Sequence, residues 1–241
     1  MTEQFEINSR YNRISGIMII PGPGKRFPCV VLSHGLISSK ESSKYAALSE
    51  KFAEAGIASC RFDYHGCGES GGNIEETTLT IRLDNLDAIT DHVMSHQSVD
   101  ARRIGIVGSS FGGTTGLLKT ARDSRIRCLS IWATPHLLED KDSSTISDVV
   151  FDKTIFTDFQ SYDILGEARK VFHTLVVHGE VDEVVPCVEG KTIYKNLQKP
   201  KGIEIIKGGD HVFSNEAHRN KAINLTLNWF RRYLISDGNK E

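Results

Sequence analysis

The sequence predicts an α/β protein built on one mostly parallel sheet of about eight strands. Short apolar and β-branched runs alternate along the chain with longer amphipathic segments, which is typical of strands joined by crossover helices. The first residues differ, because the segments 4–8 and 13–20 flank the polar turn Ser9-Arg10-Tyr11-Asn12. We therefore expect an antiparallel hairpin, then about six parallel strands with helices on both faces.

After the hairpin, predicted strands and predicted helices alternate along the rest of the chain. Strands are predicted where apolar and β-branched residues run together, over 29–33, 57–62, 103–107, 126–133, 174–178 and 202–206. Helices are predicted where apolar residues recur at helical spacing, over 43–55, 78–95, 110–122, 188–197 and 215–234. The first of these helices stops at Gly56, and the second has Leu79, Leu83 and Leu86 on one face.

Residues 135–170 break this rhythm. The segment contains the polar stretch Asp-Lys-Asp-Ser-Ser-Thr, followed by Phe151, Phe156, Phe159 and Tyr162. It is longer than ordinary connections between two strands, which predicts a functional, lid-like insertion. Because no internal repeat or low-complexity tract interrupts the chain, we expect a single domain over residues 1–241.

Composition argues against several function classes. The chain has 29 basic and 31 acidic residues and a formal net charge of −2, so it lacks the basic excess that nucleic-acid binding needs. No apolar stretch approaches the ~20 residues that span a bilayer, and the first residues lack the pattern of a secretory signal. The five scattered cysteines fit neither a disulfide framework nor a zinc pattern. We expect a cytoplasmic protein with no metal, nucleic-acid or membrane partner.

The strongest chemical signal is the segment Gly108-Ser109-Ser110-Phe111-Gly112, which has the form Gly-x-Ser-x-Gly. It lies between a predicted strand and a predicted helix, where a sharp turn would expose the central serine at the carboxyl end of the sheet. A plain tight turn is the alternative. The context predicts that Ser110 is a nucleophile, and Ser109 does not hold the central position.

A serine hydroxyl needs a base to take its proton and a carboxylate to orient that base. His211 lies in the glycine loop after the last predicted strand and is the predicted base. Asp182 follows the strand before it and is the predicted acid, since this fold class orders its residues Ser, Asp, His. Glu180 and Glu183 compete with Asp182 for this role. Asp210 is a weaker alternative, because neighbouring loop residues usually point apart.

Attack on an acyl carbon creates an oxyanion, which preorganised backbone N–H groups must meet. Phe111, the residue after the nucleophile, is one predicted donor, and Leu36 in the loop His34-Gly35-Leu36 is the other. His34 is predicted to hold this loop by hydrogen bonding. His65 is predicted to be structural, and Cys67 in the same glycine-rich loop a bystander.

With these stretches in order, the sequence resembles the α/β-hydrolase superfamily over nearly its whole length. The matching motifs are the His34-Gly35 loop, the loop 63–72, the Ser110 elbow, Asp182 and His211. Within the superfamily it is most similar to small bacterial serine esterases, including cinnamoyl and feruloyl esterases, and to serine aminopeptidase-like hydrolases. The resemblance implies an α/β-hydrolase fold and hydrolysis of carboxylic esters without a cofactor.

One departure limits this resemblance. Ser110 and Asp182 are only 72 positions apart, which leaves room for a short lid, whereas many of those esterases carry a longer one. Specificity for aromatic esters is therefore not carried over. Other superfamily chemistries place Asp or Cys at the nucleophile, where this chain has Ser110.

The expected activity is that of a serine hydrolase acting on a small-molecule ester through an acyl-enzyme. The four aromatic residues of the insertion would give an apolar roof for an acyl or aromatic group, although ordinary packing explains them equally well. A thioesterase or peptidase with the same triad is the nearer alternative. A non-catalytic binding protein on this fold is the more distant one. The sequence does not predict the oligomeric state.

Overall fold

Eight strands form one mixed sheet in the computed structural model, which describes residues 1–138, 145–146 and 149–235. Their order across the sheet is β1-β2-β4-β3-β5-β6-β9-β10. The strands are β1 (Thr2–Asn8), β2 (Arg13–Ile19), β3 (Phe27–Ser33), β4 (Ala58–Phe62), β5 (Val99–Ser109), β6 (Ile126–Trp132), β9 (Thr174–Gly179) and β10 (Lys201–Ile206). A separate two-stranded ladder pairs β7 (Thr145–Ile146) with β8 (Val149–Val150).

The pairing confirms the predicted mixture of antiparallel and parallel strands. β1 and β2 form the expected hairpin, and β2 also pairs antiparallel with β4. All pairs from β4 across to β10 are parallel. The loops that follow these parallel strands therefore leave the sheet at one edge, where this fold class places its sites.

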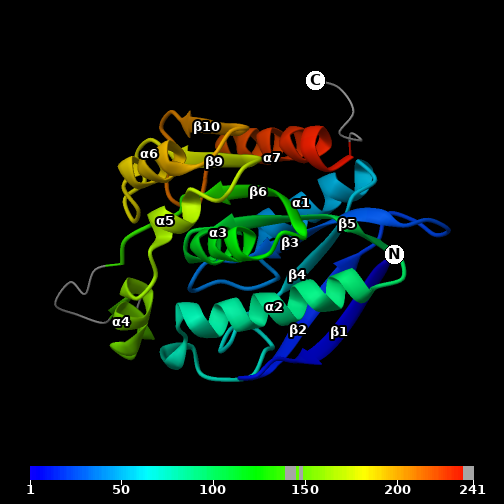
Figure 1. Cartoon of the computed structure of the whole chain (residues 1–241), viewed down its shortest axis with the longest axis horizontal. Coiled ribbons are helices and arrows are strands. Elements are labelled where there is room, and N and C mark those ends of the chain that lie inside the picture. Colours follow the sequence, from blue (N-terminus) through cyan, green and yellow to red (C-terminus); the bar gives the residue numbers. More distant parts are fainter. Residues whose placement is uncertain (139–144, 147–148, 236–241) are drawn as a thin grey trace.

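Helices cover both faces of the sheet (Figure 1). On one face, α2 (Leu79–Ser95) and α3 (Phe111–Arg122) pack against each other, with α6 (Cys187–Asn196) contributing to the same core. On the other face, α1 (Ser43–Glu54) and α7 (Glu216–Phe230) pack around Phe52, Trp132 and Phe230. A short helix at Ile74–Glu76 precedes α2, and a widened turn at Arg231–Ile235 ends α7.

The segment between β6 and β9 carries two short helices, α4 (Thr154–Gln160) and α5 (Ile164–Ala168). α4 lies beside the start of α2, where the Asp158 carboxylate accepts from the Thr80 N–H at 3.0 Å and its hydroxyl at 2.5 Å. α5 packs beside α3 and α6. The described part of the insertion thus packs on the α2–α3 face. The polar start of the predicted lid, residues 139–144, lies outside the described residues.

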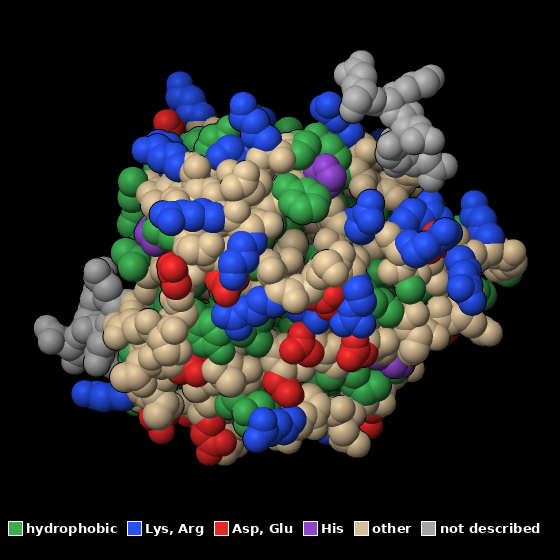
Figure 2. Space-filling model, viewed as in Figure 1, with side chains coloured by type: hydrophobic (Ala, Val, Ile, Leu, Met, Phe, Trp, Pro, Cys, Tyr) green, Lys and Arg blue, Asp and Glu red, His purple; other side chains and the backbone are tan. Residues whose placement is uncertain are grey.

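The surface has mixed charge. Figure 2 shows acidic and basic side chains interspersed over the face that α2 and α3 cover. Within the described ranges, no helix is long and apolar enough to cross a membrane.

Candidate active site

Ser110 lies at the sharp turn between β5 and α3. Its φ and ψ are 54° and −129°, a left-handed backbone that positions its side chain beyond the strand end. The turn depends on close backbone approach, because a Cβ at Gly108 would overlap the Gly112 carbonyl, and one at Gly112 would overlap the carbonyls of Ser33 and His34. The two glycines therefore allow the elbow that exposes the hydroxyl.

The three residues predicted as nucleophile, base and acid are joined by hydrogen bonds. Ser110 Oγ lies 3.1 Å from His211 Nε2, and His211 Nδ1 lies 3.0 and 2.9 Å from the two Asp182 oxygens. They come from the loops after β5, β10 and β9. Because an ionised carboxylate only accepts, the imidazole proton is on Nδ1 and the Nε2 lone pair faces the Ser110 hydroxyl. This is the arrangement that lets a histidine take a proton from serine.

Asp182 is buried and held in one orientation. Its Oδ1 accepts from the N–H groups of Val184 at 2.9 Å and Val185 at 2.8 Å. Burial alone would raise the pKa of this carboxyl, but hydrogen bonds from His178, His211 and the Val185 N–H outweigh it and hold the pKa far below its usual range. The carboxylate therefore stays charged opposite the imidazole of His211.

His178, at the end of β9, is a second histidine on the same carboxylate, and no pattern in the sequence points to its role. Its Nε2 lies 3.2 Å from Asp182 Oδ2 and 2.9 Å from the Val185 carbonyl. A carbonyl only accepts, so Nε2–H donates to both oxygens. His178 thereby holds Oδ2 of the carboxylate, the oxygen that His211 Nδ1 also contacts at 2.9 Å.

The competing acids have other positions. Glu180 accepts from the Gly208 N–H at 3.0 Å, and Asp210 accepts from the Ser214 N–H at 2.8 Å. Glu183 is exposed at the rim of the pocket beside Ser110. Among these acids, only Asp182 is hydrogen-bonded to the imidazole of His211.

The loop after β3 runs directly past the nucleophile. A Cβ at Gly35 would lie 3.5 Å from the Ser110 Cβ, so the backbone of this loop is close to the reacting oxygen. His34 is buried, its Nε2 accepting from the Tyr64 N–H at 3.0 Å and its Nδ1 lying 2.7 Å from the Gly35 carbonyl. Burial, then the Arg82 charge, hold the pKa of His34 well below its usual range, so the ring is neutral. His34 ties the β3 and β4 loops together, as predicted from the sequence.

Arg82, from α2, holds the loop after β3 through hydrogen bonds to its carbonyl groups. This buried guanidinium donates to the carbonyls of His34 and Gly35, both at 3.2 Å, and of Leu36 at 2.8 Å. With the carbonyls turned toward Arg82, the peptide N–H groups of the loop are directed away from it. No carboxylate among the described residues lies in salt-bridge distance of Arg82, and its charge instead rests over the rings of Tyr64 and Phe111.

We predict that Arg82→Lys lowers kcat about 10- to 100-fold while the protein stays folded. Lysine keeps the charge but cannot serve three carbonyls in a fixed fork, so the loop would lose its orientation beside Ser110. The measurement is steady-state hydrolysis of a chromogenic ester together with thermal unfolding. Arg122→Lys, an exposed ion-pair residue on α3, is the matched control. Equal kcat values for Arg82→Lys and the control would contradict this role.

A pocket of about 420 Å³ opens beside Ser110 and His211. Its lining combines the apolar side chains of Leu36, Ile37, Val184 and Val212 with several hydroxyl and basic groups. Cys67 lies outside this lining, and burial raises the pKa of its thiol, which fits a bystander rather than a second nucleophile.

The structure does not bring the four aromatic residues of the insertion to this pocket. Phe151, Phe156 and Phe159 are buried in the core of the α2–α3 face, and Phe159 packs on Phe111 with ring centroids 5.4 Å apart. The hydroxyl of Tyr162 lies 2.7 Å from the Thr80 hydroxyl. The predicted apolar roof is thus corrected: these side chains fasten the insertion to α2 and α3, because burial there removes their apolar surface from water.

The sheet order, the nucleophile turn and the chain order of the site residues define the chain as an α/β-hydrolase. It belongs to the prolyl oligopeptidase family, whose model matches residues 45–237. The match thus groups the chain with esterase- and peptidase-like members of the α/β-hydrolase fold.

Solved structures share the fold at low sequence identity. Est1E from Butyrivibrio proteoclasticus, solved with ferulic acid bound, superposes with a TM-score of 0.83 at 21% identity, covering 93% of this chain and 98% of that one. Dienelactone hydrolase from Anabaena variabilis ATCC 29413 superposes with a TM-score of 0.71 at 17% identity, covering 97% and 98%.

Curated relatives match over shorter segments. The mitochondrial palmitoyl-protein thioesterase ABHD10 of Bos taurus is 35% identical over 107 residues, 44% of this chain and 30% of that protein. Quorum-quenching protein AidA of Acinetobacter baumannii (strain MDR-ZJ06) is 31% identical over 100 residues, 41% and 33%. An uncharacterised 31.7 kDa Escherichia coli protein is 27% identical over 110 residues, 46% and 38%. This chain therefore spans only 30–38% of the length of each of these relatives.

Proposed function

We propose that the chain is a serine hydrolase that cleaves carboxylic esters of small molecules through an acyl-enzyme. The observation that carries this is the hydrogen-bonded series from Ser110 through His211 to Asp182, at distances of 2.9–3.1 Å, at the mouth of an open pocket. A buried, charged acid behind a correctly oriented imidazole is what activation of a serine requires.

The reaction has two halves. His211 Nε2 takes the Ser110 proton as Oγ forms a bond to the acyl carbon, and the charge that develops on the carbonyl oxygen is met by the N–H groups of Leu36 and Phe111. His211 then gives the proton to the leaving alcohol as the carbon–oxygen bond to it breaks. His211 next takes a proton from water as the water attacks the acyl-enzyme, and gives it to Ser110 Oγ as the bond from that oxygen to the acyl carbon breaks, which releases the acid and restores Ser110. Asp182 stabilises the imidazolium formed in each half.

The same steps would cleave a thioester or a peptide bond. The Bos taurus relative is named a palmitoyl-protein thioesterase, and the family is named for an oligopeptidase, so acyl transfer to water is the common class. We place esters first because Est1E, at a TM-score of 0.83, is a structure with ferulic acid bound and the pocket here is small and open. Turnover of matched ester, thioester and aminoacyl substrates would rank the three.

Reaction with a fluorophosphonate tests the proposal directly, because this probe phosphonylates only an activated serine. We expect one label per chain, found by intact mass and peptide mapping at Ser110, and no label in Ser110→Ala. Absence of labelling in well-folded protein would contradict the proposal and favour a binding protein on the hydrolase fold. Labelling at another residue would contradict the assignment of Ser110.

A further inference from the structure

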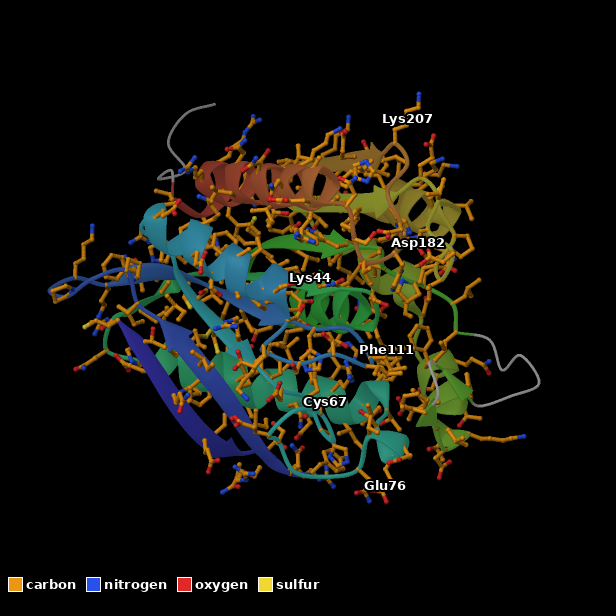
Figure 3. All side chains as sticks on the ribbon, turned by 180° about the vertical axis from the view of Figure 1, so that it is seen from behind. Lys44, Cys67, Glu76, Phe111, Asp182 and Lys207 are labelled. Carbon is orange, nitrogen blue, oxygen red and sulfur yellow. The ribbon has the colours of Figure 1, made fainter. Side chains whose placement is uncertain are left out.

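Lys44 brings a positive charge to the pocket beside the nucleophile. It belongs to the first turn of α1, and its Nζ donates to the Ser109 hydroxyl at 2.8 Å, one residue from Ser110. The same pocket is lined by Lys44, Ser109, Ser110 and His211. Figure 3 shows the labelled Lys44 and Asp182 in the region where the carboxyl ends of the strands meet.

The Lys44 ammonium has no acidic partner in the part of the chain that the structure describes. No carboxylate among the described residues lies in salt-bridge distance of its Nζ, although the residue is half-buried. Two other buried lysines are paired twice each: Lys40 with Asp63 at 2.7 Å and Glu69 at 2.6 Å, and Lys119 with two aspartates at 2.6 and 2.8 Å. A partly desolvated ammonium costs free energy unless an anion compensates it.

Burial of the Lys44 ammonium lowers its pKa to about 8, which leaves most of it protonated at pH 7. Among the described residues the ammonium donates one hydrogen bond, to the Ser109 hydroxyl, so it retains capacity to donate to a second group. The cation is therefore both present and available at neutral pH.

The surroundings of Lys44 favour an anion. The same pocket is lined by Ser42, Ser43 and, from α7, Arg219, whose hydroxyl and guanidinium groups are suited to a carboxylate. Glu183 is the acidic residue of the lining; it is exposed, and it follows β9 beside the apolar Val184. An ester lying in the pocket would thus meet apolar groups as well as basic and hydroxyl groups.

We propose that the natural substrate is an ester that carries a carboxylate, and that Lys44 is the residue that recognises this group. This inference rests on the proposed function. The ester carbonyl would lie between Ser110 and the Leu36 and Phe111 N–H groups, while the carboxylate accepts from the Lys44 ammonium.

Matched esters test this substrate class. Three probes vary the acyl part of the ester: the monomethyl ester of glutaric acid, its neutral primary-amide counterpart, and a counterpart with a trimethylammonium group. An acetate ester of a hydroxy acid and the corresponding amide test whether the carboxylate belongs to the alcohol part instead. We expect kcat/KM to favour a carboxylate ester over its amide on at least one side. In Lys44→Met that ratio should fall about 10- to 100-fold, the usual worth of a hydrogen bond between charged groups. Lys44→Glu should shift the preference to the trimethylammonium ester.

A matched control separates recognition from support of the elbow. Ser109→Ala removes the protein partner of Lys44 but leaves the ammonium, so the preference for the carboxylate ester should remain. Glutarate should also slow fluorophosphonate labelling of the wild type more than that of Lys44→Met, a reading that needs no ester turnover. Equal ratios in the wild type and Lys44→Met would overturn the inference while leaving the esterase proposal standing. A wild type that is not labelled would instead overturn the esterase proposal, and the inference with it.

Discussion

Ser110→Ala is expected to lower kcat for ester hydrolysis by about 10⁶-fold, the largest effect of any single substitution in this chain. Alanine leaves the elbow and the base in place but removes the oxygen that attacks the acyl carbon. What remains is the much slower attack of water on an ester held in the pocket. Single-turnover and steady-state hydrolysis of p-nitrophenyl butyrate would measure the change.

Ser109→Ala is the natural control for this measurement. Ser109 is the neighbouring serine, it is buried, and its hydroxyl accepts from Lys44 rather than from His211. We expect Ser109→Ala to retain most of kcat for a neutral ester and to be labelled by a fluorophosphonate at Ser110. If the effects of the two substitutions were reversed, the nucleophile would be Ser109.

Much of the fold and of the nucleophile turn can be predicted from short stretches of sequence. Every predicted strand of the main sheet is present, because buried parallel strands are nearly continuous apolar runs such as the one at 29–33. Ser110 and His211 could be predicted because glycines that permit unusual backbone surround them, and those glycines occur within a few residues of the side chain. Buried strands and tight turns each require particular residue types at neighbouring positions, so both can be recognised from the sequence.

The bounds of a strand are harder to predict where its residues are not apolar. β5 begins at Val99, whereas the prediction began at Arg103, because the intervening Asp-Ala-Arg-Arg stretch has no strand-like hydropathy. Its pairing with β3 and β6 also shifts register near Ile104. Strand pairing at this end is decided by neighbours that are distant in sequence.

Residues that act through other residues could not be found from the sequence. Arg82 lies in α2, 46 positions from the Leu36 carbonyl it binds, and its helical context suggests a surface residue. His178 and Lys44 likewise acquire their positions only when β9, α1 and the nucleophile turn come together. For the aromatic residues of the insertion the sequence left two explanations open, and Phe151, Phe156 and Phe159 are buried by packing on the α2–α3 face.

Asp182→Asn is expected to lower kcat by about 10⁴-fold without unfolding the protein. The Oδ1 of Asp182 accepts from the N–H groups of Val184 and Val185, so the amide oxygen of asparagine would keep that place. The amide NH₂ would then take the place of Oδ2, 2.9 Å from His211 Nδ1. A donor at that place forces the imidazole proton onto Nε2, which then presents N–H rather than a lone pair to Ser110.

Asp182→Asn also tests how the orientation of the His211 imidazole depends on the charge of residue 182. The low pKa of Asp182 means that the carboxylate is ionised across the range in which a histidine titrates, so the wild type never passes through the neutral acid there. Asp210→Asn changes the carboxyl next to His211, which bonds to Ser214 instead, and should lower kcat by only a few-fold. Hydrolysis of p-nitrophenyl butyrate by the two variants, with thermal unfolding of each, makes the comparison. If Asp182→Asn lost less than about tenfold, or no more than Asp210→Asn, the imidazole would be oriented by another residue and Asp182 would be a structural carboxylate.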